Sequence, residues 1–418
     1  MKTLTIAVAG CGSRGLDTYS RCQHRFADRM RIVAAADIRK ERLEMMQDEF
    51  NVPESMCFAS AEEMLAQDKL ADIMIIATPD RCHYHQAMAA LRKGYHLLLE
   101  KPIALSEQEC IDIEKLALEK NLHVVVCHVL RHTVFYQKLK KALEEVASGD
   151  VLSVHAIERV CYWHQAHSFV RGNWRNSIES SPMILQKCCH DMDILLWLVG
   201  KNCLRVSSFG SLSHYTATHA PDGAPARCTD GCPVGDSCPY NAVSYYGGLL
   251  KRGKTGWPVN VVCSHPTEEN LMNALRHGPY GRCVYRCDND VVDHQVVNLE
   301  LEGGATVNFT MCAFTAHGGR EIRLMGTKGE IVGNMETNII RIMPFGGEET
   351  EIDVNKLTQD LSGHGGGDAR MLDEFLHLVA SGAPAGSALT GISHSVQSHR
   401  VAFAAEASRL QHGAVITL

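Results

Sequence analysis

An apolar segment that runs directly into a glycine-rich turn constrains this chain more than any other feature. Residues 6–9 are Ile-Ala-Val-Ala, and the next six residues follow the pattern G-x-G-x-x-G. Gly10 would make the tight turn, Gly12 would let a phosphate approach the backbone, and Gly15 would let the next helix pack closely on the strand. A helix beginning near Ser13 would point its N-terminal N–H groups at that phosphate. The pattern predicts a dinucleotide-binding unit.

An acidic residue follows the second apolar segment at the spacing that this unit requires. Asp37 comes directly after the apolar residues 32–36. Its carboxylate can accept hydrogen bonds from ribose hydroxyls and would repel a 2′-phosphate, so NAD is favoured over NADP. Arg39 could still hold a phosphate, which leaves NADP as the alternative. The residues expected at the cofactor in this part of the chain are Gly10, Cys11, Gly12, Ser13, Arg14, Gly15, Asp37 and Arg39.

Length and composition limit the class of protein. With 418 residues, of which 45% are hydrophobic and 21% charged, the chain is typical of a globular protein of about two domains. A net charge of −7 gives no general attraction for nucleic acid. We expect no signal peptide and no membrane span, because the chain enters a strand at once and lacks a long apolar stretch. The 17 cysteines then predict cytosolic thiols or metal ligands in a cytoplasmic enzyme.

Strands and helices alternate through residues 1–125. This alternation favours a doubly wound parallel sheet, that is, an α/β dinucleotide-binding domain. Ser106 and Glu109 form a capping box at the start of the last of these helices. Strands are expected at residues 3–9, 31–36, 73–77, 96–99 and 123–127, and helices at 40–50, 61–67, 83–93 and 106–120.

Residues 126–418 form a second domain of a different type. Gly-rich turns such as residues 302–304 and 326–329 separate several predicted strands, which favours antiparallel hairpins in an α+β domain. Residues of about 212–290 form a Gly-, Pro- and Cys-rich insertion that is hard to assign. Strands are expected at residues 151–159, 204–210, 291–302, 305–311, 321–325, 330–332 and 339–343, and helices at 190–198, 369–380 and 393–411.

A Glu-Lys-Pro segment, Glu100 to Pro102, closes the strand predicted at residues 96–99. Open α/β sheets bind their ligands at the carboxyl ends of the strands. A partly desolvated lysine beside a nicotinamide can take part in proton transfer. Alone, the segment would be a surface turn, but its place after the glycine-rich turn makes Lys101 a catalytic candidate.

With these motifs in place, the chain resembles the glucose–fructose oxidoreductase / inositol dehydrogenase (Gfo/Idh/MocA) family. The resemblance covers nearly the whole chain apart from the insertion. It implies a Rossmann domain followed by a domain built on a large, open, mostly antiparallel sheet. The motifs that carry it are residues 10–15, Asp37, Ala77-Thr78-Pro79 with His83, Glu100-Lys101-Pro102, and His190-x-x-Asp193 before Trp197-Leu198-Val199-Gly200.

The resemblance also implies an activity and a catalytic pair. Relatives of this kind use NAD(P) to oxidise or reduce sugars, inositols and related polyols. Lys101 and His190 would flank the reacting carbinol as the catalytic residues. Further residues implied to line the cofactor are Thr78, Pro79, His83, Glu100 and Lys101.

One position departs from the family pattern. Relatives commonly have an acid four residues before the catalytic histidine, whereas this chain has Gln186. Because glutamine cannot relay a proton, Lys187, Asp191 or Asp193 would have to compensate.

Several polar and aromatic residues are candidates for a polyhydroxylated ligand, since aromatic faces stack on sugars beside polar donors. Core packing is the alternative for Trp174, and a salt bridge is the alternative for Arg131. Asp368 is expected to cap the helix that follows residues 364–367. The predicted substrate-binding residues are Arg131, His164, Trp174, Arg175, Lys187, Asp191 and His364.

Three cysteines in the insertion are candidate ligands of a structural zinc ion. Cys228, Cys232 and Cys238 lie in a segment rich in Pro, Gly and Asp. Their spacing is looser than that of paired C-x2-C knuckles, so free thiols are the alternative. A fourth ligand could come from Cys283, Cys287 or His219.

The expected function is therefore an NAD-dependent oxidoreductase that transfers a hydride between nicotinamide and a hydroxyl-bearing carbon of a sugar, sugar derivative or cyclitol. A homo-oligomer, dimer or tetramer, is expected from the broad sheet. The alternative is an NAD-dependent glycoside hydrolase, as in some relatives, which oxidises a sugar hydroxyl transiently, eliminates the anomeric group and returns the hydride. A third possibility is a non-enzymatic protein that binds or senses NAD.

Overall fold

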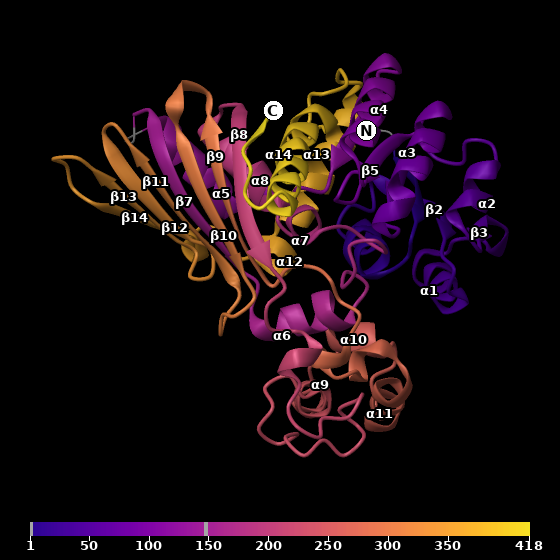
Figure 1. Ribbon diagram of the computed structural model, residues 1–418. Coiled ribbons are helices and arrows are strands. Elements are labelled where there is room, and N and C mark those ends of the chain that lie inside the picture. Colours follow the sequence, from indigo (N-terminus) through magenta and orange to yellow (C-terminus); the bar gives the residue numbers. More distant parts are fainter. Residues whose placement is uncertain (1–2, 146–148) are drawn as a thin grey trace.

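Two β-sheets and a helical lobe organise the chain in the computed structural model, which describes residues 3–145 and 149–418 (Figure 1). The first sheet has six strands and the second has nine. The lobe, formed mainly by the insertion, lies below both sheets in Figure 1. No helix in these described ranges is long and apolar enough to cross a membrane.

The first sheet confirms the predicted Rossmann arrangement. Its order is β3-β2-β1-β4-β5-β6, and every neighbouring pair is parallel. Strand β3 is only two residues long, which is why no periodic pattern reveals it. The strands are β1 (Leu4–Ala9), β2 (Met30–Ala36), β3 (Cys57–Phe58), β4 (Ile73–Ile76), β5 (His96–Leu99) and β6 (Val124–Val126).

The helices of this domain lie close to their predicted positions, with one exception. After the glycine-rich turn the chain forms a wide π-type helix, Ser13–Tyr19, and then a 3-10 helix, Ser20–His24, in place of a regular α-helix. The capping box is confirmed, since Ser106 Oγ accepts a hydrogen bond from the Glu109 N–H at 3.3 Å. The α-helices are α1 (Lys40–Phe50), α2 (Ala61–Ala66), α3 (His83–Arg92) and α4 (Glu107–Glu119).

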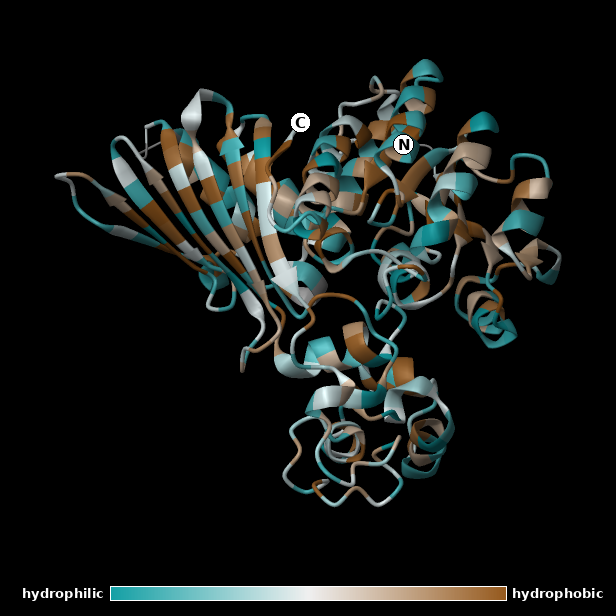
Figure 2. Cartoon of the chain, in the orientation of Figure 1, coloured by the Kyte–Doolittle hydropathy of each residue, from teal (hydrophilic) through white to brown (hydrophobic). Residues whose placement is uncertain are grey.

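The second sheet is mostly antiparallel, as expected. Its order is β14-β13-β12-β11-β7-β10-β9-β8-β15, and only the β10–β7 pair is parallel. Figure 2 shows apolar and polar residues alternating along these strands, which is the pattern of a sheet with one buried face. The strands are β7 (Val151–Arg159), β8 (Cys203–Ser211), β9 (His294–Leu301), β10 (Thr306–Cys312), β11 (Gly319–Gly326), β12 (Gly329–Asn334), β13 (Ile339–Pro344), β14 (Thr350–Asp353) and β15 (Ile416–Thr417).

Helices cover the buried face of this sheet. Val307, Phe309 and Met311 alternate inward along β10 and share one apolar cluster with residues of three helices. Burying such side chains contributes about 1.5–3 kcal/mol each. The three helices are α5 (Val134–Glu145), which the sequence pattern did not reveal, α8 (Cys189–Val199) and α14 (Ile392–Leu410).

A helix from near the C-terminus returns to the first sheet. In α13 (Gly367–Ser381), Met371 and Phe375 are fully buried in one cluster with Ile6 and Val8 of β1. The start of α13 is thereby brought beside the glycine-rich turn. The two sheets are joined through α14, whose Val396 lies in an apolar cluster of the first sheet and whose Val401 lies in that of the second.

The insertion is mostly irregular up to Asn241 and contains three helices after it. Helices α9 (Ala242–Lys251), α10 (Val259–Val262) and α11 (Glu268–His277) form the lobe, and Tyr246 and Leu275 lie in its own small apolar core. A short helix, α6 (Tyr162–His164), and the π-type helix Gln165–Arg171 connect β7 to this lobe.

Candidate active site

The glycine-rich turn has the geometry that the sequence predicts. Gly10 has φ +87°, and a Cβ atom there would lie 2.5 Å from the Ala77 carbonyl oxygen. A Cβ atom at Gly15 would lie 1.8 Å from the Gly10 carbonyl oxygen. At Gly12 the nearest atom is a guanidinium nitrogen of Arg39 at 4.0 Å. The turn is thus sterically fixed at two glycines and open at the third, where a phosphate would approach.

Asp37 is held in position at the end of β2 by two backbone groups. Its Oδ2 accepts a hydrogen bond from the Cys11 N–H at 2.8 Å, and its Oδ1 accepts one from the Arg39 N–H at 2.9 Å. The Arg39 Nε lies 3.6 Å from Oδ1, and half of that side chain is exposed. A carboxylate and a guanidinium therefore stand side by side at the edge where ribose would bind.

Arg14 does not point toward the open side of the turn. Its Nε donates to Glu100 Oε1 at 2.6 Å, and its Nη2 donates to Asp368 Oδ1 at 2.6 Å and to the Tyr19 hydroxyl. Burial opposes ionisation of both carboxyls, but Arg14 holds the pKa of each below its usual value. Arg14 and Glu100 are thus bound to each other beside the glycine-rich turn, and their place at the cofactor stays a prediction.

The expectation for Asp368 as a helix cap is also wrong. The residue that precedes α13 is Gly366, which has φ +74°, and no side chain caps this helix. Asp368 lies within the first turn, where its second oxygen is 3.0 Å from His364 Nδ1. Asp368 therefore links the glycine-rich turn, through Arg14, to His364.

His83 holds two loops together. One ring nitrogen lies 2.7 Å from the Pro102 carbonyl oxygen, and the other lies 2.9 Å from the Thr78 carbonyl oxygen. The ring is buried, so it positions the Thr78-Pro79 and Lys101-Pro102 segments and does not itself face a ligand.

Lys101 extends from the end of β5 to the helical turn α7 (Met183–Gln186). Its Nζ donates to the Gln186 carbonyl oxygen at 2.7 Å and to Gln186 Oε1 at 3.1 Å. The same nitrogen lies 6.0 Å from the centre of the Trp174 ring. Gln186, the residue at which the chain departs from the family pattern, thus holds the ammonium of Lys101 through two oxygens.

His190 lies near the start of α8, and its side chain is buried. Burial, together with the charge of Lys101, holds the pKa of its imidazole well below the usual value. Its Nδ1 has no hydrogen-bond partner among the described residues, and its ring centre lies 6.1 Å from that of His364. A neutral imidazole next to a lysine cation can accept a proton.

A buried ionic network that the sequence did not reveal lies behind this pair. Glu158 of β7 forms ion pairs with Lys187 Nζ at 3.0 Å and with Arg320 at 2.8 Å, and Arg320 Nε donates to Asp191 Oδ1 at 2.7 Å. Burial, with the neighbouring Glu158 carboxylate, raises the pKa of Asp191. Glu158 and Asp191 are thus the two acidic residues of this network. Lys187 is one of its cations, because it is paired with Glu158.

Arg131 is not available to a substrate, which corrects that expectation. It is buried and donates to both oxygens of Asp193 at 2.7 Å. The same carboxylate lies 3.0 Å from His128 Nδ1. Although burial opposes ionisation, Arg131 and His128 hold the pKa of Asp193 well below its usual value. Asp193 therefore does not compensate for the missing acid.

Arg175 forms an ion pair with Asp288. Its guanidinium donates twice to Asp288, at 2.8 Å each, and this pair ties the segment after Gly172 to the end of the insertion. His164, by contrast, is brought to the site. Burial, Lys187 and Lys101 together hold its pKa well below the usual value.

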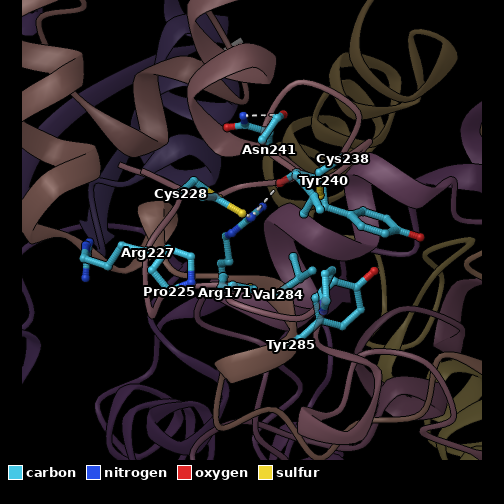
Figure 3. A pocket seen from close by; sticks show the side chains of 15 residues that line it. Arg171, Pro225, Arg227, Cys228, Cys238, Tyr240, Asn241, Val284 and Tyr285 are labelled. Carbon is cyan, nitrogen blue, oxygen red and sulfur yellow. Dashed lines mark hydrogen bonds between the residues drawn. The ribbon is translucent and has the colours of Figure 1, made fainter. Parts of the chain in front are cut away.

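The candidate zinc ligands come together only in part. One cavity is lined by Cys228, Cys232, Cys238 and Cys283 (Figure 3), whereas Cys287 and His219 do not line it. The one group of three ligand atoms within 4.8 Å in the described ranges belongs to His128, Cys189 and His399.

That buried group does not have the free lone pairs that a metal needs. His399 Nε2 accepts from the Ile103 N–H at 2.9 Å, and its Nδ1 donates to the Ser395 carbonyl oxygen at 2.8 Å. Both ring nitrogens of His399 are thus engaged in hydrogen bonds, so we assign no metal to it.

Comparison with known proteins identifies the family to which both domains are similar. A model described as the oxidoreductase family, NAD-binding Rossmann fold, matches residues 4–128, and one described as the oxidoreductase family, C-terminal alpha/beta domain, matches residues 140–417. YteT of Bacillus subtilis (strain 168), named as an oxidoreductase, is 24% identical over 387 residues, which cover 88% of each chain. The 2,7-anhydro-N-acetylneuraminate hydratase of Escherichia coli (strain K12) is 29% identical over 156 residues, covering 37% of this chain and 41% of the relative.

A solved structure matches the fold over the full length. The WlbA dehydrogenase from Chromobacterium violaceum, in complex with NADH and UDP-GlcNAcA, superimposes with a TM-score of 0.69 at 18% identity, covering 100% of this chain and 96% of that one. The two family models together span nearly all of the sequence. The chain therefore belongs to the Gfo/Idh/MocA family of NAD-binding oxidoreductases.

Proposed function

We propose that this protein is an NAD-dependent oxidoreductase that transfers a hydride at a hydroxyl-bearing carbon of a sugar, sugar derivative or cyclitol. The observation that carries the proposal is the pairing of a lysine cation, Lys101, with the buried neutral His190 at the carboxyl edge of a Rossmann sheet. Two features support NAD as the cofactor. The backbone is open at Gly12, where a phosphate can approach, and two N–H groups orient the carboxylate of Asp37.

The side chains present account for the proton and charge balance of the reaction. When bound, the nicotinamide supplies the hydride acceptor or donor. Neutral His190 accepts the hydroxyl proton as the carbinol is oxidised, and it returns that proton in the reverse direction. The ammonium of Lys101, held by Gln186, stabilises the negative charge that develops on the same oxygen.

Aromatic side chains support a sugar-like substrate. The rings of Trp163 and Trp257 lie 5.5 Å apart, and the ring of His164 lies 5.1 Å from that of Trp257. Trp174, close to Lys101, is 36% exposed, and Trp257 is 46% exposed. We propose that these faces stack on a sugar ring. WlbA, which has the same fold, is described in complex with UDP-GlcNAcA.

A second candidate is redox-neutral cleavage or hydration of a glycoside, in which the hydride returns to the sugar. The presence of Gln186 in place of an acid favours it, because the amide cannot relay a proton out of the site. The relative from Escherichia coli is named as a hydratase and not as a dehydrogenase.

Measurement of NADH formation alongside glycoside cleavage distinguishes the two candidates. The protein with NAD is incubated in D₂O with free sugars and cyclitols, and separately with their aryl glycosides. Stoichiometric NADH formation from a free sugar supports the dehydrogenase. Glycoside cleavage at constant NAD, with deuterium entering beside the oxidised carbon, supports the redox-neutral reaction. NAD binding without turnover of any compound would contradict both.

We also propose a homo-oligomer, dimer or tetramer, in the cytoplasm, without nucleic acid or membrane partners. The face of the nine-stranded sheet that points away from α8 and α14 carries polar side chains such as Asn298, Asn308 and His155, and we propose that two copies pair through this face. The 17 cysteines are all unpaired, which supports a reducing compartment. Light scattering on the purified protein measures the oligomeric state.

A further inference from the structure

Four cysteines from two separate segments of the insertion line one cavity. Cys228, Cys232 and Cys238 come from a single loop, and Cys283 comes from the segment that follows α11. Figure 3 shows Cys228 and Cys238 approaching this cavity together with Arg171. The cavity of about 20 Å³ holds about one water-sized occupant.

Backbone hydrogen bonds hold these segments against each other. The Cys228 N–H donates to the Gly281 carbonyl oxygen at 2.9 Å, and the Cys283 N–H donates to the Ala226 carbonyl oxygen at 2.8 Å. Between them, Arg227 and Arg282 form an isolated antiparallel bridge. The loop ends are thus locked in register, so the proximity of Cys228 and Cys283 is built into the backbone.

The other two cysteines are joined by a tight turn. The Gly235 N–H donates to the Cys232 carbonyl oxygen at 3.0 Å, and the Cys238 N–H donates to the Val234 carbonyl oxygen at 2.9 Å. Asn241 fixes this turn from the start of α9, because its side-chain N–H donates to the Gly235 carbonyl oxygen at 2.8 Å. Both thiols are consequently presented to the same cavity.

A buried cation beside these thiols lacks an anion. Arg171 is only 3% exposed. It donates to the carbonyl oxygens of Arg282 and Tyr240 at 2.7 Å each, and its Nη2 lies 3.7 Å from Cys228 Sγ. In the described parts of the chain no carboxylate forms an ion pair with Arg171. Because a buried charge is costly unless it is paired, this side chain points to a negative centre among the cysteines.

We propose that Cys228, Cys232, Cys238 and Cys283 bind one Zn²⁺ ion, and that Arg171 balances the negative charge of the four thiolates. Four thiolates and Zn²⁺ carry a net charge of −2, which the guanidinium partly neutralises. The sulfur atoms of no three of them yet lie mutually within 4.8 Å in the described ranges, so side-chain rotation draws them onto the ion at about 2.3 Å. The small cavity favours a single ion over an iron–sulfur cluster.

The position of Arg171 indicates what the ion stabilises. Arg171 ends the helix Gln165–Arg171, which directly follows Trp163 and His164 of α6. The zinc site thus fixes the lobe to the segment that carries these two side chains. Its existence does not depend on the proposed reaction, since it is tested by metal content and not by turnover.

Metal analysis of the full-length protein, purified without chelator and dialysed, tests the site. We expect about one zinc per chain. Each of the variants C228S, C232S, C238S and C283S should lose at least about nine-tenths of it. The control variants C263S and C287S, which change thiols of the same lobe outside the cavity, should retain the wild-type amount.

A spectroscopic experiment on the wild-type protein tests the site independently of the variants, so a variant that fails to fold does not decide the outcome. Wild-type protein stripped of metal is titrated with Co²⁺, and the expected result is the intense visible and near-ultraviolet absorption of tetrahedral Co²⁺ bound to four thiolates, saturating at one ion per chain. Wild-type protein that neither contains zinc nor takes up Co²⁺ would overturn the proposal. Loss of zinc in C287S, or iron with acid-labile sulfide in place of zinc, would also overturn it.

Discussion

Lys101 is bound twice by one residue, Gln186, through the backbone carbonyl at 2.7 Å and the side-chain oxygen at 3.1 Å. Lys101 follows β5, a strand of the six-stranded sheet, whereas Gln186 ends α7, which belongs to the second domain. The contact therefore fixes the ammonium at the junction of the two domains. It does so without a carboxylate, so the positive charge of Lys101 stays available to a substrate oxygen.

The first prediction concerns Lys101 itself. Lys101→Ala should reduce hydride transfer by at least about 100-fold, the scale on which loss of a proton-transfer or charge-stabilising group acts. NAD binding should persist, because the glycine-rich turn and Asp37 are untouched. Single-turnover rates and calorimetric titration with NAD measure the two effects. The exposed Lys115 provides the control, and activity of Lys101→Ala equal to that of Lys115→Ala would refute the role.

The second prediction concerns the glutamine. Gln186→Glu places a carboxylate within hydrogen-bond reach of Lys101 and favours the protonated ammonium. The basic limb of the pH–rate profile should therefore move to higher pH, by roughly one unit or more. Rates measured from pH 6 to 11 at saturating substrate test this shift. Gln397→Glu, a change on the surface of α14, should leave the profile where it is in the wild type.

The third prediction concerns the network below the glycine-rich turn. Arg14→Ala leaves the buried carboxylates of Glu100 and Asp368 without their shared cation. Breaking a buried pair in this way should lower the free energy of unfolding by about 3 kcal/mol or more. Urea denaturation measures the loss. Arg21→Ala, which removes an exposed ion pair with Glu49, should cost no more than about 1 kcal/mol. Equal losses in the two variants would contradict the network.

Local sequence signals predicted the parts of the site whose chemistry depends on a few consecutive residues. Gly10 and Gly15 are required by contacts that any side chain would violate, so their spacing alone identifies the turn. The long strands could be predicted because their patterns extend over many consecutive residues, such as the nine residues of β7. Strand β3, at two residues, carries no such pattern.

The partners of the charged residues could not be predicted, because they are distant in sequence. Glu158 and Arg320 meet Asp191 only through the folding of the nine-stranded sheet onto α8. One signal was present: an ionisable residue, Glu158, stands at an inward-facing position of a strand, where a charge needs a partner. Arg131 likewise became a buried ion pair and not a substrate contact because its partner, Asp193, lies on a helix 62 residues away.

The last prediction concerns the choice between NAD and NADP. Asp37 presents a carboxylate where a 2′-phosphate would lie, and two such charges at about 4 Å repel by about 4 kcal/mol at the effective dielectric constant of a protein surface. Asp37→Ser removes the charge but keeps an oxygen that can accept the Cys11 N–H. The ratio of kcat/KM for NADP to that for NAD should rise at least about 100-fold, with Arg39 as the phosphate contact.

The double variant Asp37→Ser/Arg39→Ala separates the two contributions, because it removes the guanidinium that lies 3.6 Å from the Asp37 carboxylate. Most of the gain for NADP should disappear, since no cation then remains beside the phosphate, while the preference for NAD should stay weaker than in the wild type. A gain that persists in the double variant would show that Arg39 does not contact the phosphate. An unchanged ratio in Asp37→Ser would show that the carboxylate does not face the ribose.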